Sequence, residues 1–323
     1  MKNLIKRLIP LLELPFLLPL IISAFVLKLY RRVGSKNLKR STNILKRVGV
    51  FPIRDHYYEP LFNDKYLKND LREPRKLPGI DFNEKAQIEL LKKLTYQNDF
   101  DYFLNKEIDK SDLSSFKIDN KSFKSGDAEF LFNFVRHIKP KKIIEVGCGE
   151  STKIIQSAIQ LNSKEQEKDN ICSHICIEPY EQPWLESFSN INLIRDKVEN
   201  LDFKLFQDLE DGDLLFIDSS HIIRPQGDVL WEYLSIIPSL QKRVYIHVHD
   251  IFSPYDYPDG WVKEQVLFWN EQYLLEALLT GSDKLEVVAS LNFLKHKYYE
   301  NLEKVCPYLN QSREPGSFYF RTK

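Results

Sequence analysis

The sequence predicts an α/β fold with a mostly parallel sheet. The chain has 323 residues, 43% of them hydrophobic, which is long enough for about two domains and a full core. From Asp127 onward, short apolar segments alternate with helical segments, and glycines follow the first apolar segment directly. Strands separated by helices are typical of a parallel sheet, whose ligands bind at the carboxyl ends of the strands.

The predicted elements follow one another in a regular order. Helices are expected at Asp127–His137, Ser151–Leu161, Asp228–Leu240 and Trp261–Leu279. Strands are expected at Lys142–Val146, Ile171–Ile177, Ile191–Arg195, Asp213–Ile217, Val244–Val248, Leu285–Ala289 and Ser317–Arg321. Upstream, residues 84–98 have the spacing of an amphipathic helix, with Ile88, Leu91, Leu94 and Tyr96 as its inner side chains.

The charges are divided unevenly along the chain. Residues 1–50 hold eleven Lys and Arg residues against one acid, Glu13, which leaves 35 basic and 45 acidic residues in the remainder. The acidic remainder is not expected to bind nucleic acid. The basic N-terminal part therefore requires a different partner.

That N-terminal part predicts a membrane anchor. Leu8–Leu27 contains twenty residues with a single charge, enough for a helix that crosses a hydrocarbon core of ~30 Å. Three basic residues precede it and eight lie between Lys28 and Arg47, which favours a cytoplasmic location for the rest of the chain. Residues 31–47 are expected to lie on anionic lipid head groups. A helix inserted in one leaflet and a cleaved signal peptide are the alternatives, although no small-residue cleavage pair follows the apolar run.

Four parts are expected: an anchor (1–30), a basic juxtamembrane segment (31–50), a cap with a helical extension (51–124) and the α/β domain (125–323). His56 and Tyr57 lie in the cap, where a lid over a substrate and a purely structural packing role are both open. The four cysteines do not make a disulfide scaffold. Cys172 and Cys176 have no second Cys or His pair at zinc-finger spacing, so we expect no structural zinc and interpret them as small core residues.

The first strand ends in a glycine turn. Glu145, Gly147 and Gly149 form an E-x-G-x-G motif before a helix whose first N–H groups can bind an anion. Thr152 stands where the dinucleotide fingerprint has its last glycine, which disfavours a nicotinamide cofactor.

Polar side chains also follow three later strands. Glu178 ends the second strand, where a carboxylate can accept both hydroxyls of a ribose. Asp218 ends the fourth strand, and His221 follows three residues later. His249 and Asp250 end the fifth strand, with His247 and His249 on one face.

Together these motifs resemble the class I S-adenosylmethionine-dependent methyltransferases, in particular the small-molecule O-methyltransferases. The resemblance covers residues 125–323 and implies a seven-stranded Rossmann-like sheet whose last strand is antiparallel. It implies that Glu145, Gly147 and Gly149 hold the methionine part of S-adenosylmethionine, and that Glu178 holds the ribose. The loop at 196–199, including Val198, would approach the adenine, residues 125–129 would pack over the cofactor, and Asp218 would also contact it.

The chemistry of methyl transfer suggests further roles. An aliphatic hydroxyl is a poor nucleophile, so the enzyme needs a general base or a metal. Asp218, His221 and His249 are the candidate catalytic residues, with the two histidines as bases. Alternatively, Asp218, His249 and Asp250 hold a divalent cation. Arg224 and Tyr255 are candidate substrate contacts, Arg224 for an acidic acceptor and Tyr255 in the loop after the fifth strand.

The leading hypothesis is a membrane-anchored methyltransferase that uses S-adenosylmethionine. It would O-methylate a glycan, a lipid-linked sugar or another small metabolite at the cytoplasmic membrane face, because tethering raises the local concentration of a membrane-bound acceptor. The alternatives are an NAD(P)-dependent oxidoreductase on a similar sheet and a non-catalytic, membrane-tethered scaffold.

Overall fold

The computed structural model describes residues 2–53, 55–56, 58–105, 115–165 and 172–323, with side chains described from residue 13 onward. The chain divides into two compact units, Met1–Lys68 and Asn69–Lys323, and each is described by itself. The predicted cap, residues 51–124, is therefore spread over both units.

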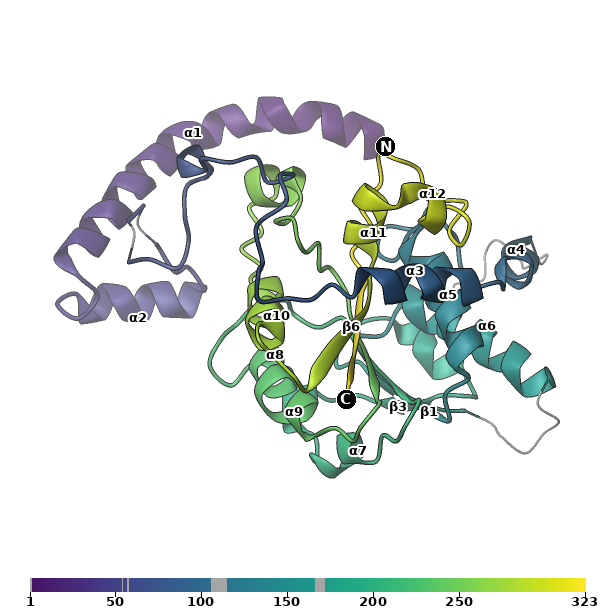
Figure 1. Ribbon diagram of the computed structural model, residues 1–323. Helices are drawn as coiled ribbons and strands as arrows, with labels where there is room; N and C mark the ends of the chain where they lie inside the picture. Colours follow the sequence, from purple (N-terminus) through teal and green to yellow (C-terminus); the bar gives the residue numbers. More distant parts are fainter. Residues whose placement is uncertain (1, 54, 57, 106–114, 166–171) are drawn as a thin grey trace. The chain divides into compact units, whose positions relative to one another are not determined.

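The N-terminal unit consists of two helices and a short turn. They are α1 (Lys2–Val33), α2 (Lys39–Val48) and the 3-10 turn η1 (Asp64–Tyr66). Helix α1 is continuous through Pro15 and Pro19, and it curves along its length (Figure 1). The Tyr30 hydroxyl lies 2.7 Å from Thr42 Oγ1 and joins α1 to α2.

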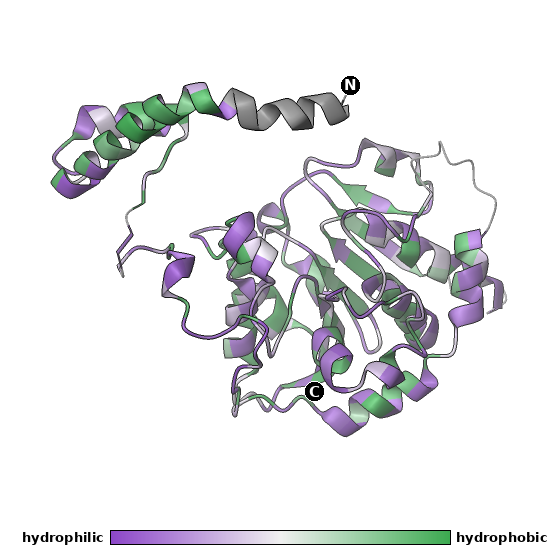
Figure 2. Cartoon of the chain, turned by 90° about the horizontal axis from the view of Figure 1, so that it is seen from above, coloured by the Kyte–Doolittle hydropathy of each residue, from purple (hydrophilic) through white to green (hydrophobic). Residues whose placement is uncertain are grey.

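The apolar surface of α1 is exposed. Glu13–Val33 is long and apolar enough to cross a membrane, and 6% of its most apolar window is buried within the structure. Figure 2 shows the hydrophobic colour along this helix. A signal sequence near the N-terminus has the same length and composition.

The second unit is built on a seven-stranded sheet. Its strands are β1 (Lys142–Val146), β2 (Ser173–Ile177), β3 (Asn192–Ile194), β4 (Leu214–Ile217), β5 (Tyr245–Val248), β6 (Leu285–Ser290) and β7 (Phe318–Thr322). The spatial order is β3-β2-β1-β4-β5-β7-β6. Strands β1 to β5 are parallel, and β7 runs antiparallel to β5 and β6. The predicted sheet and its antiparallel last strand are confirmed.

Helices cover both faces of the sheet (Figure 1). One layer holds α5 (Asp127–Ile138) and α6 (Glu150–Glu165), with α3 (Glu84–Lys93), α4 (Gln97–Asn105), α11 (Leu291–Lys297) and α12 (Tyr299–Leu302) nearby. The other holds α7 (Lys204–Gln207), α8 (Asp228–Trp231), the π-helical turn η4 (Glu232–Ile236), α9 (Ile237–Ser239) and α10 (Glu271–Leu279). Short turns η2 (Pro183–Ser187) and η3 (Val198–Asn200) follow β2 and β3.

Side chains alternate between the two layers because successive residues of a strand point to opposite faces. In β1, Ile143 packs with the α5–α6 layer and Ile144 with the α8–α10 layer. In β4, Phe216 and Ile217 divide in the same way. All four side chains are fully buried, so both layers are held by the same strands.

Two predicted helices are interrupted. The helix expected at Trp261–Leu279 is wrong, because a π-helical turn η5 (Gly260–Glu264) is followed by irregular chain before α10 begins at Glu271. Val266 adopts a left-handed φ of 56°, which a continuing helix does not allow. The helix expected at 84–98 ends at Lys93, and the Tyr96 N–H donates to Asn133 Oδ1 instead of continuing it.

Candidate functional site

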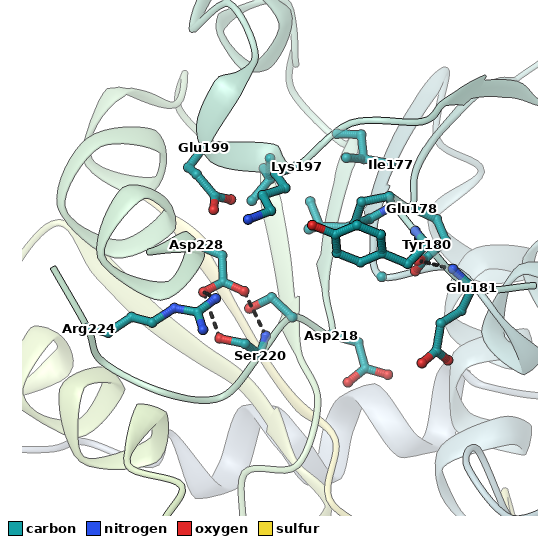
Figure 3. A pocket seen from close by; sticks show the side chains of 15 residues that line it. Ile177, Glu178, Tyr180, Glu181, Lys197, Glu199, Asp218, Ser220, Arg224 and Asp228 are labelled. Carbon is teal, nitrogen blue, oxygen red and sulfur yellow. Dashed lines mark hydrogen bonds and ion pairs between the residues drawn. The ribbon is translucent and has the colours of Figure 1, made fainter. Parts of the chain in front are cut away.

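A cleft opens where the strand order reverses. Strands β1 and β4 are neighbours there. The strands after β1 are added on one side of this pair, and the strands after β4 on the other side. Sheets of α/β proteins bind ligands at such a point. The cleft has a volume of about 420 Å³, within the range of small-molecule sites. Its walls come from the residues that follow β1, β2, β3 and β4 (Figure 3).

Gly147 is required at the floor of this cleft. Its φ is 78°, and a Cβ at this position would lie 1.9 Å from the Asp218 carbonyl oxygen. The close approach of β1 and β4 therefore leaves no room for a side chain. The resulting bare backbone is the kind of surface that an extended cofactor can approach closely.

Glu178 faces the cleft, with one carboxylate oxygen already used. Oε1 accepts hydrogen bonds of 2.9 Å from the N–H groups of Tyr180 and Glu181, which fixes the turn after β2. Arg195 Nη1 donates to the Glu178 and Glu181 carbonyl oxygens and supports the same turn. No hydrogen bond from another described residue to Oε2 is found, so this oxygen can accept hydrogen bonds from a ribose.

The far end of the cleft is lined by η3 and by the loop after β4. Val198 is 3% exposed and lines it between the polar side chains of Lys197 and Glu199. On the β4 side, Asp228 accepts hydrogen bonds from the Ser220 N–H and hydroxyl at 2.9 and 2.7 Å (Figure 3). An apolar side chain framed by donors and acceptors suits a heteroaromatic base.

Glu145 and Gly149 do not line the cleft, and their predicted contact with the cofactor stays a prediction. Glu145 is fully buried, and its Oε1 accepts hydrogen bonds from the Ser151 and Thr152 hydroxyls. The Gly149 N–H donates to Thr152 Oγ1 at 3.0 Å, and no atom beyond its chain neighbours lies within 4 Å of a Cβ built at Gly149. Thr152 thus holds the turn where a dinucleotide fingerprint has glycine.

His221 lies between three carboxylates, which with it form the carboxylate–histidine cluster (Asp218, His221, Asp250 and Glu271). Its Nδ1 lies 2.8 Å from Glu271 Oε2, and its Nε2 lies 3.3 Å from Asp218 Oδ1 and 3.7 Å from Asp250 Oδ2. The ring also packs on Trp269, with centroids 4.2 Å apart.

The carboxylates decide the charge of His221. Burial alone would lower its pKa, but the hydrogen bonds to Asp218 and Glu271 and the charges of Glu271 and Asp250 raise that pKa well above the usual value. Burial raises the pKa of Asp218, yet His249 and His221 outweigh it and hold the pKa below the usual value. His221 is therefore a cation with both nitrogens engaged, which argues against the predicted role of a base.

His249 is the remaining histidine at this edge. It is 2% exposed, its Nε2 lies 3.5 Å from Asp250 Oδ1, and its Nδ1 has no hydrogen-bond partner among the described residues. His247 lies on the same face, as predicted, but it is fully buried against Phe216, and burial lowers its pKa well below the usual value. His247 is a neutral core residue.

Two of the three predicted cation ligands, Asp218 and Asp250, lie close together, and a different histidine lies beside them. Ligand atoms of Asp218, His221 and Asp250 lie within 4.8 Å of one another. The predicted third ligand was His249, whereas the histidine close to both carboxylates is His221. His221 and Asp250 both have left-handed φ values, 61° and 59°.

The candidate substrate residues have separate locations. Arg224 lines the cleft, with Nη2 3.9 Å from Asp228 Oδ1. Tyr255 does not line it; its ring packs against His296 with centroids 4.4 Å apart. His56 belongs to the N-terminal unit, and Tyr57 lies outside the described residues, so both remain predictions.

The sequence analysis missed Glu271 and Asp228. Glu271 lies 50 residues after its partner His221, and no local pattern links them. Asp228 was recognised only as the first residue of a helix, and no local pattern links it to Ser220, eight residues earlier.

Residues 125–129, expected over the cofactor, make hydrogen bonds to the end of the chain, and their contact with the cofactor stays a prediction. Asp127 Oδ1 accepts hydrogen bonds from the Gly316 and Ser317 N–H groups at 2.9 and 2.8 Å. Glu129 accepts one from the Tyr308 N–H, and burial raises its pKa to about 7. This segment therefore fixes the chain before β7.

The sheet order and the cleft define the class of protein, a class I methyltransferase fold with a site for S-adenosylmethionine. The Gly147 backbone, the free oxygen of Glu178 and Val198 fit the three parts of that molecule. Residues 144–251 match the model of a family described as a methyltransferase domain. This match supports an S-adenosylmethionine-dependent methyltransferase of class I and favours it over the oxidoreductase and scaffold alternatives.

Similar proteins were found among curated sequences and solved structures. An uncharacterised protein from Archaeoglobus fulgidus is 29% identical over 196 residues, which cover 56% of this chain and 84% of the relative. A putative O-methyltransferase from Klebsiella pneumoniae is 13% identical, covers 73% of this chain and 89% of its own, and has a TM-score of 0.37. An O-methyltransferase from Bacillus cereus in complex with SAH is 11% identical, covers 80% and 94%, and has a TM-score of 0.36.

Proposed function

We propose that this methyltransferase transfers its methyl group to a hydroxyl of a small acceptor. One observation carries the proposal: Asp218 lines the cofactor cleft and also belongs to the carboxylate–histidine cluster. An acceptor bound at that cluster would therefore lie next to the cleft. Such proximity is the main requirement of a displacement between two bound molecules.

The cleft residues would hold the cofactor by its three parts. The Gly147 turn would take the amino-acid part, Glu178 the ribose hydroxyls and Val198 one face of the adenine. When bound, S-adenosylmethionine supplies an electrophilic methyl group on a sulfonium. The chain itself has to orient the acceptor and remove its proton.

We assign the general base to His249. Asp218 has a lowered pKa, so it is ionised at neutral pH and can accept a hydrogen bond from the acceptor hydroxyl, but it is a weak base. His249 keeps Nδ1 without a partner among the described residues, while Nε2 lies near Asp250. A histidine base commonly has a carboxylate next to one ring nitrogen and accepts the proton on the other nitrogen.

A divalent cation is the alternative way to activate the hydroxyl. Asp218, His221 and Asp250 would hold it, and a bound cation would lower the pKa of the acceptor hydroxyl. Chelation separates the two mechanisms. Turnover that survives EDTA supports His249 acting alone, whereas turnover lost in EDTA and restored by Mg²⁺ supports the cation.

We also propose that α1 anchors the enzyme and that the acceptor is a glycan, a lipid-linked sugar or another small metabolite at the cytoplasmic face. Helix α1 exposes large apolar side chains, among them Leu18, Ile22 and Phe25. Helix α2 has no buried residue, and its basic side chains (Lys39, Arg40, Lys46 and Arg47) suit anionic head groups. The Trp269 ring on His221 would give the acceptor site an apolar wall.

Fractionation tests the anchor. Leu18→Lys with Ile22→Lys places two charges in the apolar segment, each of which costs about 3 kcal/mol in a membrane. We expect the wild-type chain in the membrane fraction and this variant in the soluble fraction. The control, Leu18→Ile with Ile22→Leu, should stay with the membrane. A wild-type chain found in the soluble fraction would contradict the anchor.

Mass spectrometry tests the reaction. Cells that contain the full chain should accumulate a product heavier by one CH₂ than a metabolite of cells that lack it. Purified chain with methyl-labelled S-adenosylmethionine and the corresponding extract should transfer the label, and His249→Asn should not. Label found on nitrogen or sulfur of the product would contradict O-methylation.

A further inference from the structure

A second polar cluster lies next to the glycine turn, outside the cleft lining. We call it the thiol cluster, and it consists of Glu145, Cys148, His174 and Cys176. The exposed fractions of these residues are 0%, 5%, 2% and 0%. None of the four lines the cofactor cleft, and the proposed methyl transfer does not use them.

Strand pairing brings these residues together. Glu145 of β1 lies directly opposite Cys176 of β2 in the parallel register. His174 is two residues before Cys176 and so points to the same face of the sheet. Cys148 follows Gly147 in the turn, and its thiol returns toward the same face, 3.7 Å from the Ile177 carbonyl oxygen.

Three of the donor atoms lie close together, and the fourth, from His174, lies next to two of them. Ligand atoms of Glu145, Cys148 and Cys176 lie within 4.8 Å of one another. His174 Nε2 lies 2.9 Å from Glu145 Oε2 and 3.5 Å from Cys176 Sγ, and Cys176 Sγ lies 3.7 Å from Glu145 Oε2. These are two sulfur donors, one imidazole nitrogen and one carboxylate oxygen.

A second set of hydrogen bonds orients these donors. The Gln156 side-chain amide lies 2.7 Å from His174 Nδ1, which leaves Nε2 to face the cluster. The Ser151 and Thr152 hydroxyls donate to Glu145 Oε1, which leaves Oε2 to face it. Partners of this kind on the outer atoms of ligating His and carboxylate groups are typical of metal centres.

We propose that the thiol cluster is a closed structural site for zinc. Zinc prefers four Cys, His and carboxylate ligands in a tetrahedron, and its bond lengths place neighbouring donors about 3.3–3.8 Å apart. The 3.5 and 3.7 Å separations match this spacing. The 2.9 Å pair, His174 and Glu145, opens by a few tenths of an ångström when the cation displaces the proton between them.

The position of the site gives zinc a structural role. Its ligands belong to β1, to the glycine turn and to β2, so the cation ties Gly147 to the strand that ends at Glu178. Uptake displaces protons from the ligands, and affinity for zinc therefore falls as the pH falls. The site is distinct from the carboxylate–histidine cluster, whose oxygen-rich donors include no sulfur.

Elemental analysis of the full chain, purified in detergent without added chelator, tests the proposal. We expect one zinc per chain in the wild type. Cys148→Ser with Cys176→Ser should lose it, while Cys172→Ser and Cys306→Ser should keep it, because these two buried cysteines lie outside the cluster. Zinc that stays in the double variant, or a folded wild-type chain without zinc that takes up none on addition, would overturn the proposal.

Cobalt provides a test that needs no variant. The wild-type chain refolded with Co²⁺ should show thiolate-to-cobalt charge-transfer absorption and the intense visible bands of a tetrahedral site. Mg²⁺ in excess should leave these bands unchanged. Bands of an octahedral, thiolate-free site would overturn the proposal, as would a disulfide between Cys148 and Cys176 in the freshly purified chain.

Discussion

The two halves of the cleft edge are built in different ways. Between β1 and β2 the backbone forms the site: Gly147 has no room for a side chain, and two N–H groups fix Glu178. Between β4 and β5 side-chain charges form it, with His221 among three carboxylates. The first half depends on local sequence and the second on residues far apart in the chain, which makes the second harder to predict and easier to disturb.

The largest expected effects come from the charged half. His249→Asn should reduce turnover by about 10²–10⁴-fold, the usual contribution of a general base, and leave cofactor affinity unchanged. Asp218→Asn should reduce both turnover and cofactor affinity, because Asp218 belongs to both halves. Steady-state kinetics and calorimetry measure the two effects. His137→Asn, at the end of α5, is the control, and a His249→Asn variant with wild-type turnover would rule out this base.

The backbone half is tested by two glycines that look alike in the sequence. Gly147→Ala forces a Cβ onto the Asp218 carbonyl and strains a positive φ, so cofactor affinity should fall by at least about 100-fold. Gly149→Ala has open space around the new Cβ and should change affinity by less than about 5-fold. Equal losses in the two variants would show that the cleft does not depend on the β1–β4 approach.

A smaller effect concerns the chain that supports Asp250. Glu314 lies two residues before Gly316, whose backbone packs against Asp250. Burial raises the pKa of Glu314, but His296, Lys295 and Asn292 outweigh it and lower that pKa to about 2. A lowered pKa stabilises the fold above the unfolded value of 4.5, and this stabilisation is lost as the pH falls from 4.5 toward 2.

Glu314→Gln should therefore lower the free energy of unfolding by about 2–3 kcal/mol at neutral pH. The difference from the wild type should shrink as the pH falls from 4.5 toward 2. Urea unfolding at several pH values measures it, with the exposed Glu303→Gln as the control. A difference that is independent of pH would show that the carboxylate charge is not the cause.

The contrast between the two halves of the cleft edge also explains which parts of the fold and the site could be predicted from the sequence. The strand at Lys142–Val146 was predicted to the residue, and Gly147, Glu178, Val198 and Asp218 line the cleft as expected. These positions follow from buried runs and from the chain that leaves each strand. Local patterns are enough to place them.

The long-range contacts could not be predicted from spacing. Glu271 meets His221 only because an irregular segment, expected to be helical, brings α10 back to the sheet edge. The sequence suggested that Cys176 be considered together with Cys172. The fold instead places Cys176, on β2 beside β1, close to Cys148. Glu145 belongs to a motif that suggested the cofactor, but its carboxylate is fully buried and accepts a hydrogen bond from the Ser151 hydroxyl.

Calorimetric titration of the full chain in detergent with S-adenosylmethionine tests the account most directly. We expect one site per chain, and NADH should not compete for it. In Glu178→Gln the amide oxygen can still accept the Tyr180 and Glu181 N–H groups, but a donor replaces the free acceptor, so affinity should fall by about 10–100-fold. A folded wild-type chain without a binding signal, or a Glu178→Gln chain that binds as tightly as the wild type, would contradict the account.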